Sequence, residues 1–185
     1  RLLDSLPAEN GWVAVFTQKT TEKEEAGPED LHPTGVAAQV LRVVKNDDSV
    51  VAIVSARERI RLRQTIATEP FLTIEAEYLT TRPHPDSPTW EAAVVSLRDS
   101  ALKLLSMKTE VPDQVAAFVR DLGDGGKLAD FVAGGLEVET TEKQAVLDEL
   151  DPFKRVKLSQ RLVGKQVGKA KGLAKNRPLP VAHHG

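Results

Sequence analysis

Apolar residues in the first half of the chain occur in short runs and in alternation, the two patterns that β-strands produce. Residues 36–44 are apolar on nearly both faces, as expected of a central strand, and a polar turn follows at 46–49. The turn signal Asn10-Gly11 precedes the first apolar run. We predict strands at residues 12–17, 36–44, 50–55, 59–66 and 71–79. Connections this short favour an antiparallel meander or a small open barrel.

Residues 80–89 interrupt these patterns. Pro83, Pro85 and Pro88 each lack a backbone donor and stiffen the chain, so neither helix nor sheet is expected there. We therefore place a boundary in this stretch, between a β-rich subdomain at residues 1–82 and a helical subdomain at residues 83–163.

The second half carries apolar residues at helical spacing. The first predicted helix extends from Trp90 to Leu105, over roughly four turns. Pro112 fits the first turn of a second helix, which the glycine-rich segment 123–126 is expected to end. A short helix follows at 127–133. In the second helix we expect four residues to face the core: Val115, Phe118, Val119 and Leu122.

Two more helices are predicted towards the end of the chain. Thr141 and Gln144 form a candidate capping box for the first, and Asp151-Pro152 supplies a cap and a first-turn proline for the second. Glycines at 164, 168 and 172 each cost about 1 kcal/mol of helix stability relative to alanine. We therefore expect residues 164–185 to form a basic, flexible tail. The predicted fold class is α+β, an amino-terminal antiparallel sheet or open barrel followed by a carboxy-terminal helical bundle.

Composition narrows the class of protein. The 185 residues are 41% hydrophobic but only 4% aromatic, so a core of aliphatic residues is expected. No run approaches eighteen apolar residues, which argues against a membrane span, and the absence of cysteine excludes disulfides and thiolate metal sites. A cytoplasmic protein fits best. The net charge of −2 conceals an acidic stretch at residues 20–30 and a basic region beyond Asp151.

Candidate chemistry is weak throughout the sequence. The segment Gly125–Leu128 resembles a phosphate-binding loop but lacks the required hydroxyl, and no serine lies in a nucleophile-elbow motif. Glu75 and Glu77 share a strand face, where solvated carboxylates are the simpler interpretation than a glycosidase pair. The histidines are scattered, at His32, His84, His183 and His184. We predict no catalytic residue, no cofactor and no metal site.

Alternate arginines form the most suggestive cluster, at Arg57, Arg59, Arg61 and Arg63. The last three share one side of the strand predicted at 59–66 with Thr65, and the other side, with Ile60, Leu62, Gln64 and Ile66, is expected to be mostly dry. Such a row could follow a phosphate backbone, or it could protect a sheet edge from aggregation. No aromatic residue lies between the arginines to stack on bases, which favours edge protection. For the basic tail two alternatives also remain: it binds phosphates, or it is a solvated helix face.

Five segments carry distinctive sequence motifs. They are V-A-V-F-T-Q-K at 13–19, P-E-D-L-H-P-T-G-V-A-A at 28–38, T-E-P-F-L at 68–72, G-K-L-A-D-F-V-A at 126–133 and T-E-K-Q at 141–144. In this order they resemble the amino-terminal domain of Lon-type ATP-dependent proteases, in which a strand ending in T-Q-K precedes a P-x-D-L-x-x-x-G-x-x-A segment. The likeness covers most of the chain.

The sequence departs from that family at both ends. The family's opening strand, with the pattern L-P-L-R-[DN]-x-V-x-F-P, has no counterpart after Arg1. We expect either that this strand is missing or that Arg1 is not the natural start. The long charged helix that leads to the ATPase is replaced by the glycine–lysine tail, which leaves a stand-alone domain as an alternative.

The resemblance implies binding and no catalysis. In Lon such domains help to select unfolded or tagged proteins, so the implied partners are unfolded or damaged proteins and a hexameric Lon-type ATPase–protease. The alternative is an adaptor that binds proteins, or nucleic acid through the arginine strand and basic tail; a membrane partner is not expected. Phe71, Tyr78 and Trp90, which we expect to be half-exposed, are the hypothetical substrate contacts.

Overall fold

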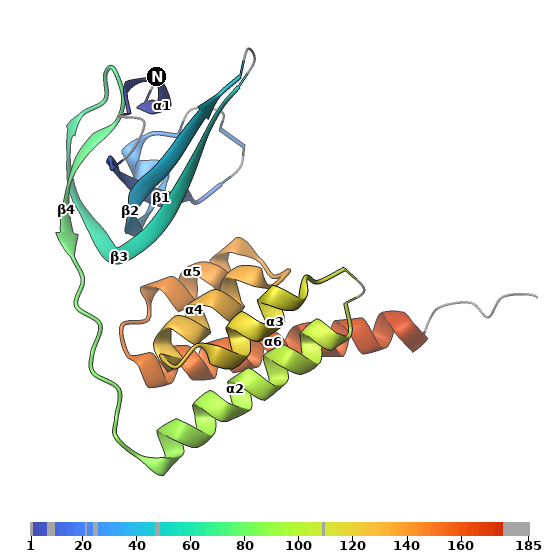
Figure 1. The fold of residues 1–185 in the computed structure, drawn as a ribbon. Coiled ribbons are helices and arrows are strands. Elements are labelled where there is room, and N and C mark those ends of the chain that lie inside the picture. Colours follow the sequence, from blue (N-terminus) through green and yellow to red (C-terminus); the bar gives the residue numbers. More distant parts are fainter. Residues whose placement is uncertain are drawn as a thin grey trace, which may run out of the picture. The chain divides into compact units, whose positions relative to one another are not determined.

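A computed structural model describes residues 2–6, 10–20, 22–23, 26–46, 49–108 and 110–175. The chain divides into two compact units, Arg1–Thr81 and Arg82–Gly185. The first unit contains the strands and the second contains the long helices, so the fold class is α+β (Figure 1). No helix among the described residues is long and apolar enough to cross a membrane.

The first unit is a curved four-stranded sheet in which every neighbouring pair is antiparallel and the strand order follows the chain order (Figure 1). Its elements are α1 (Leu2–Ser5), β1 (Trp12–Gln18), the 3₁₀ turn η1 (Pro28–Asp30), β2 (Leu31–Lys45), β3 (Val50–Ala67) and β4 (Thr73–Tyr78). A half-barrel meander of this kind needs only short connections, as the sequence predicts.

The third strand is longer than the sequence pattern predicts. The segments expected as separate strands, 50–55 and 59–66, form the single strand β3. Opposite β2, Ala37 pairs with Glu58 and Ala38 with Ala56, so Arg57 is the extra residue of a bulge through which the strand continues. A second irregularity skips Ile66, whose neighbours pair with β4, and Ile66 is 59% exposed. The prediction of a dry position for Ile66 is therefore wrong.

Contacts around the turn between β1 and β2 explain the roles of Asp30 and Gly35 in the 28–38 motif. The Asp30 carboxylate accepts hydrogen bonds from Lys23 Nζ at 2.7 Å and from the Gly27 N–H at 3.0 Å. Gly35 pairs with Phe16, and a Cβ at residue 35 would collide with the Val15 carbonyl oxygen and the Phe16 ring. These motif residues therefore shape the entry into β2 and its close approach to β1.

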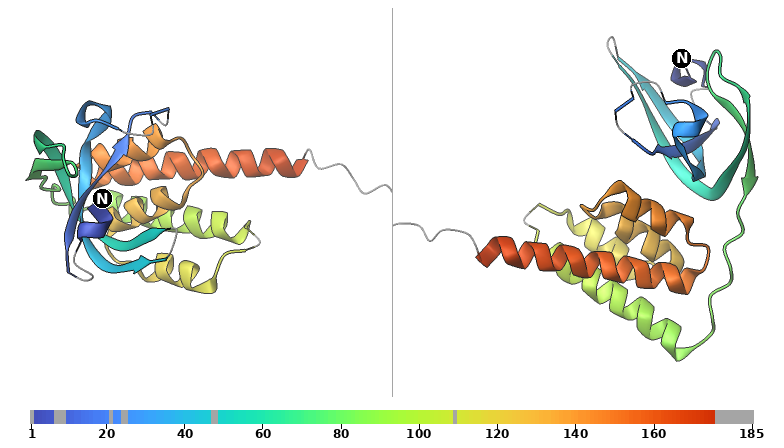
Figure 2. Two further views of the ribbon diagram at one scale, coloured as in Figure 1. Left: turned by 90° about the horizontal axis from the view of Figure 1, so that it is seen from above. Right: turned by 180° about the vertical axis from the view of Figure 1, so that it is seen from behind.

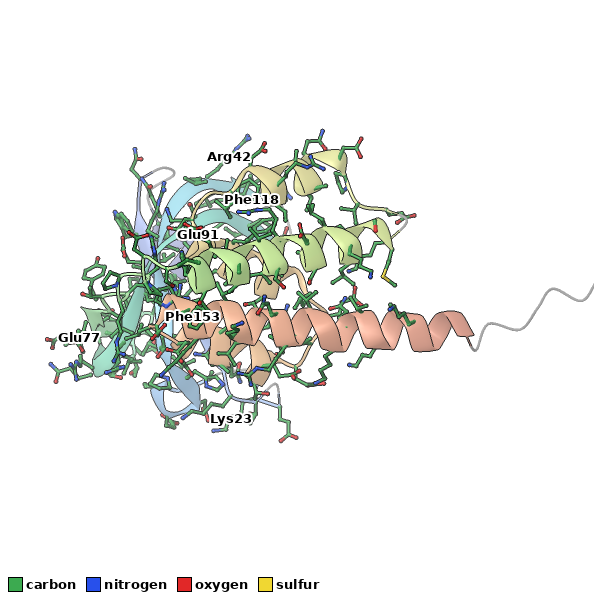
Figure 3. The ribbon with its side chains drawn as sticks, turned by 90° about the horizontal axis from the view of Figure 1, so that it is seen from below. Lys23, Arg42, Glu77, Glu91, Phe118 and Phe153 are labelled. Carbon is green, nitrogen blue, oxygen red and sulfur yellow. The ribbon has the colours of Figure 1, made fainter. Side chains whose placement is uncertain are left out.

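The second unit is a helical bundle (Figures 1 and 2). Its helices are α2 (Pro88–Ser106), α3 (Asp113–Asp121), α4 (Gly125–Gly135), α5 (Thr140–Asp148) and α6 (Pro152–Lys175). The two longest helices, α2 and α6, run alongside one another (Figures 2 and 3). Phe153, at the start of α6, contacts Trp90 of α2, with ring centroids 6.4 Å apart. The apolar stripe of α2 lies in the core, with Leu97 fully buried.

The glycines at 125 and 126 begin a helix and do not terminate one. They form the first turn of α4, where the Asp124 side chain caps the Lys127 N–H at 3.0 Å. An added Cβ at Gly125 would lie 2.5 Å from Val94 Cγ2 and 2.7 Å from Trp90 Cζ2. Glycine is therefore needed here for close packing against α2, a cause that the local sequence does not reveal.

Of the two predicted helix caps, the one at Asp151 is present, whereas the capping box of α5 begins at a different residue. Asp151 accepts hydrogen bonds from the N–H groups of Phe153 and Lys154, which confirms its role as a cap. The capping box of α5 instead begins at Glu139, whose N–H donates to Glu142 Oε2 at 3.2 Å. Gln144 is buried and its amide donates to Asp148, so it is not available for the predicted box with Thr141.

The last helix continues well beyond Val163, through the stretch that glycine content predicts to be flexible. Tertiary contacts explain the difference: Gln166 is buried and its Oε1 accepts the Glu137 N–H at 2.8 Å, and Val167 packs against the core. Packing of one helix face outweighs the intrinsic cost of glycine. The remainder of the predicted tail, 176–185 with His183 and His184, lies outside the described residues.

Candidate functional site

A groove of about 480 Å³ opens on the helical unit between α2, α3 and α4. Its walls are mainly aliphatic, and only Lys108 and Asp130 contribute charged side chains. The other side chains of the lining are Ala101, Leu104, Leu105, Val111, Val115, Val119, Phe131, Val132 and Leu136. An apolar concavity with few polar groups is the usual form of a site for apolar ligands or side chains.

The local sequence accounts for the open groove. Leu104 and Val119 are buried and form its floor, whereas Leu105 and Val115 are half-buried and remain accessible. Gly134 and Gly135 end α4 at the same place, and an added Cβ at either position would meet no atom within 4 Å. The absence of side chains at these two positions keeps that part of the groove unfilled.

An aromatic pair borders the groove. The rings of Phe118 on α3 and Phe131 on α4 lie with their centroids 4.6 Å apart and tilted by 54° (Phe118 is labelled in Figure 3). The Phe118 side chain is 48% exposed and Phe131 is 41% exposed, so the prediction that Phe118 faces the core is wrong. Of the two, Phe131 lines the groove. Exposed neighbouring aromatics provide apolar surface that a partner can cover.

The charges of the groove are already paired. Lys108 Nζ lies 2.9 Å from Glu137 Oε1, and this hydrogen bond, together with the lysine charge, lowers the pKa of Glu137 below its ordinary value. Asp130 forms an ion pair with the buried Arg155 at 3.2 Å. Because both charged side chains of the lining have partners, the surface that the groove offers is mainly that of its apolar walls.

The three predicted substrate contacts lie in different environments. Tyr78, at the end of β4, is 67% exposed, and Phe71 is half-buried just before that strand. Trp90 is only 7% exposed, so the expectation that it is half-exposed is wrong. Its ring stacks on His84 at 5.0 Å and packs against Phe153. The sequence alone does not reveal the groove, because its aliphatic residues have the same helical spacing as core residues.

Arginines of the row on β3 have polar partners on the neighbouring strands. Arg57 donates to Gln39 Oε1 at 2.9 Å, and Arg63 forms an ion pair with Glu77 on β4. Glu75 accepts a hydrogen bond from Gln64. These cross-strand contacts make both carboxylates part of the sheet surface, as the simpler interpretation of the sequence predicts.

Comparison with known proteins agrees with this architecture. Residues 1–165 match the family model of the ATP-dependent protease La (LON) substrate-binding domain. The Lon protease of Desulfovibrio desulfuricans is 33% identical over 156 residues, covering 84% of this chain and 18% of that protein. The Lon protease of Desulfosudis oleivorans is 30% identical over 168 residues, covering 90% of this chain and 20% of that protein. The chain thus spans about a fifth of the length of these relatives.

The fold has a counterpart among solved structures. The N-terminal domain of Mycobacterium avium complex Lon protease matches with a TM-score of 0.62 and 16% identity, over 84% of this chain and 91% of that one. This likeness concerns the fold, whereas the family model covers the sequence from Arg1 into α6. The chain therefore belongs to the family of Lon substrate-binding domains.

Proposed function

We propose that this chain is the client-selecting domain of an ATP-dependent Lon-type protease and binds unfolded or tagged proteins without catalysing their cleavage. The observation that carries the proposal is the apolar groove with Phe131 in its wall, in a chain of the Lon substrate-binding family. Unfolded proteins expose the apolar side chains that such a groove accepts, and native proteins bury them.

The partners follow from the same proposal. Damaged or unfolded proteins are the clients, a Lon-type ATPase–protease hexamer is the assembly that receives them, and the cytoplasm is the location. Weak contacts suit this role because a selector must release its client to the next step. Tyr78 and Phe71 on the first unit are proposed as additional contacts, since their rings are at least partly accessible. Trp90 would contribute through the packing of the helical unit.

Two phenylalanine variants test the groove. We expect Phe131→Ala to weaken binding to a permanently unfolded, reduced and alkylated protein by about tenfold, equivalent to about 1.4 kcal/mol. Phe118→Ala is the matched control, because it removes the same ring contact from the other side but does not line the groove. Fluorescence anisotropy with the labelled unfolded protein measures both affinities, and thermal melting checks that the two variants are equally folded.

Two results would contradict the proposal. One is equal affinity of the chain for the native and the unfolded forms of the same protein. The other is an equal loss of affinity in both phenylalanine variants, which would assign binding to the aromatic border or to fold stability and not to the groove.

A further inference from the structure

The solvent-exposed face of α6 has an unusual composition. From Pro152 to Gly172 every exposed position is lysine, arginine or glycine. These positions are Lys154, Lys157, Arg161, Gly164, Lys165, Gly168, Lys169, Lys171 and Gly172. A helix face that only needs to be soluble commonly mixes glutamate with lysine, because i,i+4 pairs of opposite charge stabilise it. The exposed positions of α6 between Pro152 and Gly172 include no acidic residue, so no i,i+4 pair of opposite charge stabilises this face.

Charge is also segregated within the helical unit. Residues 82–151 contain fourteen acidic and seven basic residues, whereas Pro152–Lys175 contains eight basic residues and no acidic one. The net charges of the two parts nearly balance, at −7 and +8, but among the described residues only Arg155 and Lys165 of the helix form ion pairs with those carboxylates. Arg155 is buried beside Asp130 and points away from solvent, and Lys165 Nζ is 2.7 Å from Glu142 Oε1. The hydrogen bond from Lys165 lowers the pKa of Glu142, so that carboxylate stays ionised.

Four cations of the face remain without an ion pair to any described carboxylate: Lys154, Lys157, Arg161 and Lys171. Lys157 Nζ instead lies 5.5 Å from the centre of the Phe153 ring. Like charges three or four residues apart on one helix face repel one another. A bound anionic partner would relieve that repulsion.

The spacing of these cations suits an extended acidic polypeptide. Lys154, Lys157, Arg161 and Lys165 follow at intervals of three or four residues, which is about 4.5–6 Å along the helix axis. Alternate residues of an extended chain are about 6.6–6.8 Å apart. Flexible lysine and arginine side chains span the small mismatch. On either side of Lys165, Gly164 and Gly168 carry no side chain and have no neighbour within 4 Å of a Cβ position, so a partner backbone can approach closely.

Other polyanions fit this face less well. Between Pro152 and Gly172 every fully exposed position is lysine, arginine or glycine. The half-buried Phe153, Leu158 and Val167 pack against the core, which leaves little apolar surface to insert into a membrane or to stack on bases. A nucleic acid duplex carries one charge per about 1.7 Å of its axis, and it would extend past α6 into the field of the acidic part of the unit. A short acidic segment would contact only the helix.

We propose that the basic face of α6 is a second client-binding surface, which holds acidic segments of polypeptides. This inference rests on the proposed function, in that it assigns a further class of client sequence to the same domain. The groove between α2, α3 and α4 would hold apolar segments, and the α6 face would select for acidic residues flanking them.

A pair of double variants tests this surface in the full chain. The probe is a labelled sixteen-residue peptide of glutamate, aspartate, serine and glycine, compared with its glutamine and asparagine counterpart. We expect Lys157→Gln with Arg161→Gln to weaken binding of the acidic peptide by about tenfold, and the wild-type affinity to fall as salt is added. The control, Lys103→Gln with Lys127→Gln, removes the same charge from exposed positions on α2 and α4, and we expect a change within twofold.

The outcomes separate this inference from the proposed function. Phe131→Ala should leave the acidic peptide unaffected, and the α6 variant should keep its affinity for an uncharged apolar peptide. Equal binding of the acidic and amide peptides, equal loss in the control, or tighter binding of a DNA duplex than of the acidic peptide would overturn the inference. None of these results would bear on the apolar groove. Circular dichroism confirms that each variant is folded.

Discussion

Glycine has opposite roles at two positions of the helical unit. At Gly125 the backbone lies so close to Trp90 and Val94 that a side chain would displace them. At Gly164, on the exposed face of α6, an added Cβ would meet nothing within 4 Å. At Gly125 the missing side chain permits tight packing, whereas at Gly164 it lowers helix stability without any benefit to packing.

We therefore predict opposite effects of the same substitution at these positions. Gly125→Ala should destabilise the protein by about 1–3 kcal/mol, because the new methyl group overpacks the core beside Trp90. Gly164→Ala should stabilise it by up to about 1 kcal/mol through helix propensity. Urea unfolding followed by circular dichroism measures both changes. A neutral Gly125→Ala variant would mean that Trp90 moves freely to accommodate the methyl group.

At the scale of elements, strands and helices extend where tertiary contacts support them. The strand β3 continues through the bulge at Arg57 because the ladder with β2 resumes on both sides of it. The helix α6 continues to Lys175 because Gln166 accepts the Glu137 N–H and because its apolar face is buried. In both cases the local pattern predicts an interruption, and pairing or burial elsewhere in the chain prevents it.

The contact of Gln166 gives a test at this scale. Gln166→Ala removes the side-chain oxygen that accepts the Glu137 N–H, and an unsatisfied amide costs about 1–3 kcal/mol. We expect amide hydrogen exchange to accelerate in the last turns of α6, with little change in α2. Lys169→Ala, at an exposed position of the same helix, is the control. Unchanged exchange near Gly168 in the Gln166 variant would show that burial alone fixes this end of the helix.

At the scale of the whole molecule, the helical unit has a core of its own. The cluster of buried apolar residues extends from Trp90 to Val163 and includes members of α2, α3, α4, α5 and α6. The backbone hydrogen bond from Arg82 to Leu150, at 3.0 Å, ties the start of the unit to the segment before α6. Such a unit meets the physical requirements for folding alone.

We accordingly predict that residues 82–185 fold without the β-rich unit. The fragment should give a cooperative thermal transition and a helical circular dichroism spectrum. It contains Trp90 and not Trp12, so its tryptophan emission should be blue-shifted by burial and should shift to the red on unfolding. A broad, non-cooperative transition with solvent-exposed tryptophan emission would contradict independent folding.

Patterns along the chain were sufficient to predict the order of elements, the α+β class and the resemblance to Lon substrate-binding domains. The element order and the class depend on local periodicity, turn residues and caps such as Asp151, which act over a few neighbouring residues, whereas the resemblance rests on the five sequence motifs. The burial of Trp90, the first turn of α4, the length of α6 and the apolar groove were decided only by the tertiary structure. Each depends on residues distant in sequence, as Gly125 and Trp90 or Gln166 and Glu137, because packing and hydrogen bonding between elements override local propensity.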